Sequence, residues 1–239
     1  MSDLFDIHPE LRTRIDGLCR NLPWCVTGAS ALVHDRDALF LPTLLATTNM
    51  EMQSWQNFEI TRPELWQRRQ DGDLVAGVGG IGGSIEQGET ILECLYREAE
   101  EELGVRIEVE SASETHLVYE QRTLETMAPQ QREYPLPVLC TISENLYRRE
   151  RYPGCSILVI VTFMAQLSER PTPEDIYGLL IVPRRALAAV FMPDEMALDQ
   201  LRRIPDVRIL IRETLPGDLL LSPVWTGRSF QLLLQAGRL

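Results

Sequence analysis

The segment 82–105 constrains this chain more than any other part of its sequence. It reads GGSIEQGETILECLYREAEEELGV, a glycine-rich turn followed by a long run of helix-forming residues. Thr90 can cap a helix here, because Glu93 stands three residues later and completes a capping box. Gly104 stands where a left-handed C-terminal cap favours glycine. The segment therefore predicts a helix over residues 90–103, entered and left through glycine turns.

Three acidic residues of this helix are expected to lie together along the border of its apolar stripe. An α-helix turns by about 100° per residue, so Glu98, Glu101 and Glu102 fall within about 100° of its circumference. The stripe that packs on a sheet is expected to comprise Leu92, Leu95, Tyr96, Ala99 and Leu103. Carboxylates this close repel one another unless a cation neutralises them, and hard oxygen ligands suit Mg²⁺ or Mn²⁺. The three acids are therefore interpreted as a metal site.

The other charged residues of the helix receive different interpretations. Arg97 lies on the flank beside Glu101, where it can pair with a carboxylate and hold it in place. Glu93 and Glu100 lie on the far side and are interpreted as solvated charges. Glutamate-rich helices are usually only exposed surface, and an isolated EAEEE run would be interpreted in that way. The glycines that flank this helix at fixed spacing argue against that interpretation here.

The fixed residues of this segment resemble the Nudix box, G-x5-E-x7-R-E-U-x-E-E-x-G-U, in which U is an apolar residue. Every fixed position is filled, by Gly83, Glu89, Arg97, Glu98, Ala99, Glu101, Glu102, Gly104 and Val105. The resemblance implies an α/β (α+β) sandwich, the Nudix fold, in which a mixed β-sheet lies between helices. Outside the box the resemblance is weaker and extends over residues 25–192. Ile81 departs from the pattern of many relatives, which have Pro there.

The resemblance also implies a reaction, the Mg²⁺-dependent or Mn²⁺-dependent hydrolysis of a diphosphate linkage in a nucleoside diphosphate derivative. The implied metal ligands are Glu98, Glu101 and Glu102. The implied catalytic residues are Glu101, Glu102 and Arg97. Glu89 is expected to support the site from its edge. Gly82 and Gly83 are expected to let the backbone approach the substrate phosphates.

Residues outside the box are expected to complete the site. The resemblance implies a further acid from a later loop, for which Glu174 is the candidate and Glu144 the alternative. For each of them, a solvated loop acid is the competing interpretation. Base recognition in the family usually involves aromatic and arginine residues, and Trp66, Arg68 and Arg69 could stack on a ring or hold a phosphate. Trp66 is explained equally well as buried packing.

A second glycine pattern lies directly before the box. Residues 77–82 read GVGGIG and fit G-x-G-x-x-G, the dinucleotide-binding fingerprint. That fingerprint must open a helix whose N-terminus faces the pyrophosphate. A predicted strand and turn follow here instead, so the sequence argues against a dinucleotide-binding fold.

The chain is predicted to hold one Nudix domain with extensions. The predicted boundaries are 1–24 for an N-terminal helical extension, 25–205 for the domain, 49–72 for an inserted arm and 206–239 for a C-terminal extension packed on the domain. Strands are predicted at 25–34, 38–46, 73–78, 106–110, 116–121, 156–166 and 176–182. Further helices are predicted at 4–20, 183–191, 194–203 and 229–236, and polar loops at 123–135 and 143–154.

Composition narrows the possible partners. The 239 residues, of which 44% are hydrophobic, suffice to bury a core. The formal net charge of −12 argues against a nucleic-acid polymer or an anionic membrane as partner. A small phosphorylated substrate is compatible with this charge, because bound divalent cations invert the local field. The sequence shows neither a signal-peptide pattern nor a long apolar span, which predicts a cytoplasmic protein.

Several other chemistries are excluded by the residues available. All 23 basic residues are arginine, which rules out a Schiff-base lysine and a Walker-type phosphate loop. The five cysteines and three histidines lack the spacing of a zinc site. They are interpreted as core or surface residues.

The sequence defines the reaction class better than the substrate. The arm at 49–72 and the N-terminal segment favour a homodimer whose partner helps to close the pocket, and hence a nucleotide-sugar or ADP-ribose-like substrate. One alternative is a house-cleaning nucleoside triphosphate pyrophosphohydrolase. Another is a non-catalytic Nudix-fold module that only binds a ligand, but such proteins tend to lose box carboxylates, and none is missing here.

Overall fold

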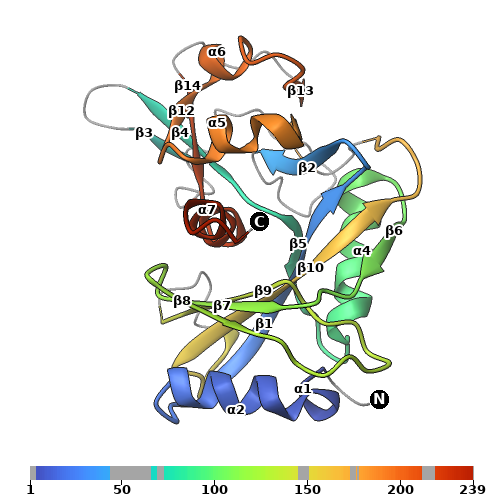
Figure 1. The fold of residues 1–239 in the computed structure, drawn as a ribbon, viewed down its shortest axis with the longest axis vertical. Coiled ribbons are helices and arrows are strands. Elements are labelled where there is room, and N and C mark those ends of the chain that lie inside the picture. The colour runs from blue at the N-terminus through green and yellow to red at the C-terminus, as the bar shows by residue number, and fades with distance from the viewer. Residues whose placement is uncertain are drawn as a thin grey trace.

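The computed structural model describes residues 4–43, 66–68, 73–144, 151–172, 176, 178–211 and 219–238. Its centre is a mixed β-sheet, covered on one face by helix α4 (Ile91–Leu103) and on the other by helix α7 (Thr226–Gln235) (Figure 1). This arrangement confirms the predicted α/β sandwich with a mixed sheet between helices.

Two long parallel strands form the middle of the sheet, β1 (Trp24–His34) and β10 (Ile157–Leu167). The other strands are β2 (Ala38–Thr43), β3 (Trp66–Arg68), β4 (Leu74–Val78), β5 (Ile81–Ser84), β6 (Ile107–Glu110), β7 (Thr115–Tyr119), β8 (Thr123–Met127), β9 (Leu139–Ser143), β11 (Gly178–Pro183), β12 (Met196–Ala197), β13 (Arg208–Ile211) and β14 (Leu219–Pro223). The main path runs β12-β14-β4-β2-β1-β10-β9-β7-β8, and β5 pairs with β1.

Alternation along the central strands produces two separate cores, because successive side chains of a strand point to opposite faces. On β1, Ala29, Ala31 and Val33 pack in the core that includes α4. Leu32 packs in the other core, together with Phe230 of α7. Both faces of the central strands are therefore buried.

The N-terminal region forms two helices, α1 (Leu4–Ile7) and α2 (Pro9–Leu18), instead of the single helix predicted over 4–20. The break falls at His8 because the residue before a proline disfavours helical backbone, whereas Pro9 suits the first helical position. The predicted hairpin between the first two strands is confirmed. Its turn is held by the Asp35 carboxylate, which accepts hydrogen bonds from the backbone N–H groups of Asp37 and Ala38.

Two local predictions are wrong, and one strand was not predicted. The predicted loop over 123–135 contains strand β8, which pairs with β7, and strand β9 is a strand that the sequence pattern did not indicate. The helix predicted over 194–203 is reduced to α6 (Leu198–Leu201), preceded by the short strand β12. The prediction over 183–191 is confirmed as a 3₁₀ turn (Arg184–Ala186) and α5 (Leu187–Phe191).

Two further features concern the chain as a whole. Cys25 and Cys155 are joined by a disulfide, which the sequence did not predict, with their Cα atoms 5.8 Å apart. Cys19, Cys94 and Cys140 are buried and free, as expected of core residues. None of the helices in the described ranges is long and apolar enough to cross a membrane.

Candidate active site

Helix α4 carries the site and is fixed at both ends by the residues that predicted it. Thr90 Oγ1 accepts a hydrogen bond from the N–H of Glu93 at 3.3 Å, and the Glu93 carboxylate accepts one from the N–H of Thr90 at 2.8 Å. Gly104 adopts the left-handed conformation with φ 66°, and its N–H donates to the Glu100 carbonyl. A Cβ at Gly104 would also lie 2.6 Å from Thr172 Oγ1. The predicted capping box and glycine cap are both confirmed.

The acidic residues lie differently from the prediction. Glu98 and Glu102 are only 6% and 7% exposed and lie within the face that packs on the sheet, not along its border. The apolar residues of that face are Ile91, Cys94, Leu95, Ala99 and Leu103. Tyr96, predicted to pack inward, is 45% exposed. The sheet therefore meets the helix along a line that runs through the two glutamates.

The glycines before the helix lie against these carboxylates. The N–H of Gly82 donates to Glu102 Oε2 at 2.9 Å. A Cβ added at Gly83 would lie 2.1 Å from Glu98 Oε1. Gly82 has φ 139°, a conformation that residues with a Cβ rarely adopt. The two predicted phosphate-loop glycines thus lie next to two of the predicted metal ligands.

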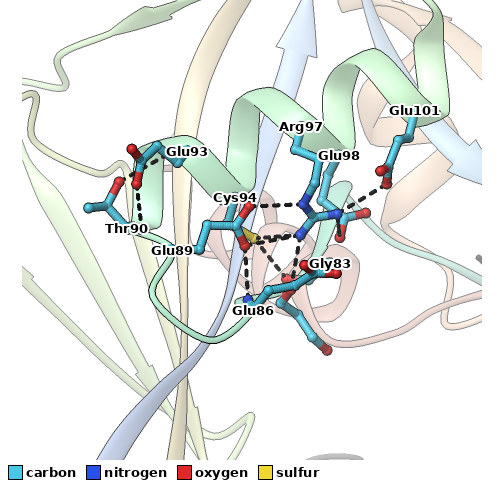
Figure 2. Close-up of polar contacts among 10 residues, drawn as sticks. Gly83, Glu86, Glu89, Thr90, Glu93, Cys94, Arg97, Glu98 and Glu101 are labelled. Atoms are coloured by element: carbon cyan, nitrogen blue, oxygen red, sulfur yellow. Dashed lines mark hydrogen bonds and ion pairs between the residues drawn. The ribbon is translucent and has the colours of Figure 1, made fainter.

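Arg97 joins three carboxylates through its guanidinium group (Figure 2). Its Nε and Nη2 donate to the two oxygens of Glu89 at 2.9 and 3.1 Å. Its Nη1 donates to Glu98 Oε1 at 2.8 Å and to Glu101 Oε2 at 3.1 Å. The remaining Nη2 proton reaches the Ser84 carbonyl at 3.2 Å. One positive charge therefore holds three negative ones, and Glu102 adds a fourth.

The pKa values of Glu98 and Glu89 are shifted in opposite directions. Burial raises the pKa of Glu98, and the neighbouring Arg97 only partly offsets it. Hydrogen bonds from Arg97 lower the pKa of Glu89, which is less buried. Burial also raises the pKa of the Cys94 thiol to about 12, so this cysteine beside the Gly83 carbonyl stays protonated and unreactive. A further cation next to Glu98 would stabilise its ionised form.

The structure brings only some of the predicted metal ligands close to one another. Within the described part of the chain, no three acidic, histidine or cysteine side chains meet closely enough to hold a metal ion. Glu98 and Glu102 lie on one face of α4, whereas the Glu101 side chain is 40% exposed and held by Arg97. The donor set nevertheless suits a hard divalent cation, because it consists of carboxylate oxygens with excess negative charge.

The predicted residues outside the box are described less completely. The backbones of Trp66 and Arg68 belong to β3, which pairs with β4. Their side chains, and the whole of Arg69 and Glu174, lie outside the described residues. Glu144, the alternative acid, follows β9 and accepts a hydrogen bond from Tyr119 Oη at 3.2 Å.

The glycine pattern at 77–82 does not open a helix. It spans the end of β4, a turn and the start of β5, as predicted from the residues that follow it. The start of α7, a helix predicted over 229–236, packs behind this turn, and this contact was not predicted from the sequence. The N–H of Val224 donates to the Val78 carbonyl at 2.9 Å, and a Cβ at Gly227 would lie 2.2 Å from that oxygen. In the sequence, only the glycine at position 227 pointed to this contact, and glycine is too common a residue for the contact to be predicted from it.

Comparison with known proteins identifies the domain. Residues 58–175, which include the whole of α4 and its flanking loops, match the model of the NUDIX domain. No curated protein matches the chain.

Solved structures of the same type resemble the chain at low identity. A NUDIX-family hydrolase from Clostridium perfringens is 14% identical over 68% of this chain and 83% of its own, with a TM-score of 0.35. The dihydroneopterin triphosphate pyrophosphohydrolase of E. coli is 15% identical over 68% of this chain and 83% of its own, with a TM-score of 0.33. A MutT protein from Bacillus halodurans is 18% identical over 75% and 77%, with a TM-score of 0.30.

These structures are too distant to indicate a substrate. The complete box on a capped helix, with the matched domain around it, shows that the chain belongs to the Nudix hydrolase family and is a pyrophosphohydrolase, an enzyme that acts on acid anhydrides.

Proposed function

We propose that this enzyme hydrolyses the diphosphate linkage of a nucleoside diphosphate derivative, with a nucleotide sugar or an ADP-ribose-like molecule as substrate, in a reaction that requires Mg²⁺ or Mn²⁺. The observation that carries the proposal is the pair of buried glutamates, Glu98 and Glu102. An ionised carboxylate is costly to bury unless a charge or a metal compensates it. Arg97 compensates only part of the charge around this pair.

The metal ligands would be Glu98 and Glu102, and Glu101 would act either as a third ligand or as the base. A bound divalent cation supplies a Lewis acid that neutralises charge on the phosphate oxygens and acidifies water. Glu102 is oriented for binding by the Gly82 N–H, and Glu98 by the guanidinium group of Arg97. The Gly82 N–H and the Arg97 guanidinium group would thus hold the two carboxylates in place for a cation.

The reaction itself breaks one phosphoanhydride bond. The oxygen of a water molecule attacks one phosphorus, the bond from that phosphorus to the bridging oxygen breaks, and the second phosphate leaves with the bonding electrons. The water proton would pass to Glu101, the most exposed of the three acids, and from there to solvent. Gly82 and Gly83 present no side chain to the phosphates, so the backbone of β5 can lie against them.

The test is a turnover assay with ADP-ribose, UDP-glucose, a diadenosine polyphosphate and dGTP, each with and without Mg²⁺. We expect Mg²⁺-dependent release of nucleoside monophosphate from at least one diphosphate derivative. Glu102→Gln should lower kcat by about 10²–10³-fold, the effect of removing one group that stabilises the transition state. Glu100→Gln, an exposed acid of the same helix, is the matched control and should retain activity.

Two results would contradict the proposal. If dGTP is hydrolysed but none of the diphosphate derivatives is, the enzyme is a nucleoside triphosphate pyrophosphohydrolase instead. If Glu102→Gln is as active as the wild type, Glu102 is not a metal ligand in the reaction. The predicted homodimer and the predicted cytoplasmic location stay predictions.

A further inference from the structure

Two buried hydroxyl groups lie side by side in the middle of the sheet without a hydrogen-bond partner among the described residues. Ser30 on β1 and Thr162 on β10 are opposite each other in the register of the parallel pair. Ser30 is 5% exposed and Thr162 is fully buried. Neither Ser30 Oγ nor Thr162 Oγ1 makes a hydrogen bond to any described residue. Such groups are rare in folded proteins, because an unsatisfied buried hydroxyl costs free energy.

The pair lies on the face of the sheet opposite α4. On β10, Val161 and Phe163 pack in the core that includes α4, so Thr162 between them points to the other face. Ser30 points the same way, since a Cβ at Gly80 would lie 2.5 Å from its Oγ and 3.0 Å from Thr226 Cγ2 of α7. The first turn of α7 and the glycine turn before β5 therefore cover the pair from one side.

On its other side the pair is followed by one partly exposed residue of β10. Ile160 is the next residue of β10 on this face, and it is partly exposed although it lies in a central strand. Its register partner on β1 is Gly28, which is buried against the glycine segment before α4, since a Cβ at Gly28 would lie 2.8 Å from the Gly83 carbonyl oxygen. The register of β1 also shifts between Val26 and Gly28, an irregularity typical of strands next to binding sites. A group lying over Ile160 would be next to both hydroxyls, because Ser30 and Thr162 are the following residues on this face of β1 and β10.

The pair is also joined to the metal-binding side through the backbone. Ser30 is opposite Gly82 in the β1–β5 ladder, and the Gly82 N–H holds Glu102. A substrate whose diphosphate lies against Gly82 could therefore extend around the edge of this ladder toward Ser30.

We propose that Ser30 and Thr162 form a recognition subsite for the uncharged polar group attached to the substrate's diphosphate. This inference rests on the proposed function, of which it specifies the substrate side. Neighbouring strands lie about 4.8 Å apart, so the two hydroxyls can bind one group that carries a donor and an acceptor next to each other. The amide edge of a nucleobase and the vicinal diol of a sugar both have this chemistry. A phosphate does not suit the subsite, because Gly28, Ser30, Ile160 and Thr162 carry no charge.

The variants are Ser30→Ala and Thr162→Val, which remove a hydroxyl and preserve shape. Thr141→Val is the matched control, because Thr141 lies on the same face and is opposite Ile160, but its Oγ1 donates to Ser229 Oγ at 2.8 Å. Two measurements on the full chain are compared: binding and turnover, and the melting temperature without ligand.

In the first measurement, the probes are AMP, GMP, UMP, CMP and ribose 5-phosphate for binding, and the diphosphate derivatives for turnover. Each variant should raise the Kd of a cognate probe and the KM of its parent substrate by about threefold to tenfold, the value of one hydrogen bond. The change in kcat should be smaller, because the subsite does not touch the reacting phosphorus. Loss of ribose 5-phosphate binding would assign the subsite to the sugar, and loss confined to one nucleotide would assign it to the base.

In the second measurement, Ser30→Ala and Thr162→Val should leave the melting temperature unchanged or raise it, since they remove unsatisfied groups. Thr141→Val should lower it by a few degrees, because it leaves Ser229 without its partner. A decrease for Ser30→Ala as large as that for Thr141→Val would show that the hydroxyl is already satisfied without ligand, and would overturn the subsite.

The two proposals fail in different ways. Turnover with Kd and KM values unchanged in both variants would retain the proposed function and reject the subsite. Probe binding that weakens in both variants, without hydrolysis of any diphosphate derivative, would support the subsite and reject the function. Binding of no probe at all would reject the subsite.

Discussion

The two helices that cover the central sheet bury polar groups in opposite ways. Helix α4 buries the carboxylates Glu98 and Glu102 against an arginine and a backbone N–H. Helix α7 buries neutral groups, and Ser229 and Gln231 have protein partners, Thr141 Oγ1 and the Pro193 carbonyl. Burying an ionised carboxylate costs far more than burying a hydroxyl or an amide. The α4 face thus carries a cost that stability alone does not explain, whereas the α7 face is consistent with ordinary packing.

Removing Arg97 is the most direct test of this difference between the α4 and α7 faces. Arg97→Met leaves three glutamates around an apolar side chain and should lower the free energy of unfolding by about 2–3 kcal/mol, less than for a fully buried pair because Arg97 is partly exposed. Urea denaturation without metal measures the change. Arg202→Met removes an exposed pair with Asp199 and should cost under about 0.5 kcal/mol. Similar losses for both variants would mean that the α4 cluster is ordinary surface charge.

The second test replaces one glycine by alanine on each face of the sheet. At Gly227 of α7 a Cβ would lie 2.2 Å from the Val78 carbonyl oxygen, which is backbone and cannot turn away. Gly227→Ala should therefore lower the free energy of unfolding by about 1–3 kcal/mol. At Gly83 the clash is with the end of the Glu98 side chain, which can rotate, so Gly83→Ala should cost less stability.

The two alanine variants should separate function from stability. Gly83→Ala moves Glu98 from its place and should reduce kcat by about tenfold to 100-fold. Gly227→Ala should retain most of its kcat at a temperature where it is folded. Denaturation curves and initial rates on the same preparations decide this. The reverse pattern, with Gly83→Ala active and unstable, would show that Glu98 serves packing rather than catalysis.

A pH series sharpens the comparison further. Because the pKa of Glu98 is raised in the folded protein, ionising it disfavours folding as the pH rises from the ordinary carboxyl range through the raised value. In metal-free buffer, Glu98→Gln should therefore become more stable relative to wild type over that rise. Mg²⁺ should reduce the difference, since it would bind the ionised carboxylate. Thermal melts at several pH values, with and without Mg²⁺, measure it. A constant difference at all pH values would contradict the prediction.

The smallest expected effect concerns the helix caps. Helix α4 has a side-chain cap from Thr90, whereas the residue before α7, Trp225, makes no capping hydrogen bond and has φ 45°. Thr90→Ala should lower the free energy of unfolding by about 1 kcal/mol. Thr90→Ser keeps the hydroxyl and is the control. If both variants melt together with wild type, the cap contributes nothing beyond the packing of the helix.

The sequence predicted those parts of the molecule that depend on neighbouring residues. The caps of α4, its length and the position of Arg97 beside Glu101 follow from local spacing. The face that α4 buries does not, because periodicity alone could not show that Gly82 and Gly83 would lie against the two glutamates. For the same reason β8 and β9 were missed. β8 is largely polar and partly exposed, and only its pairing with β7 defines it.

The unpartnered hydroxyls illustrate the limit most clearly. Ser30 and Thr162 stand in two strands that the sequence predicted, and nothing in either strand distinguishes them from other polar residues. Their lack of partners becomes visible only when the pairing of β1 with β10 and the position of α7 are known.

The parallel pairing of β14 with β4 has a consequence for the order in which the enzyme is made. Strand β4 leads directly into the glycine turn and the box, but its partner β14 and the helix that backs the turn belong to residues 219–235. A ribosome releases these residues only after the whole matched region 58–175 has emerged. A nascent chain therefore carries every box residue well before it can fix the turn beside them. Enzymatic activity should therefore appear late in synthesis, when β14 pairs with β4.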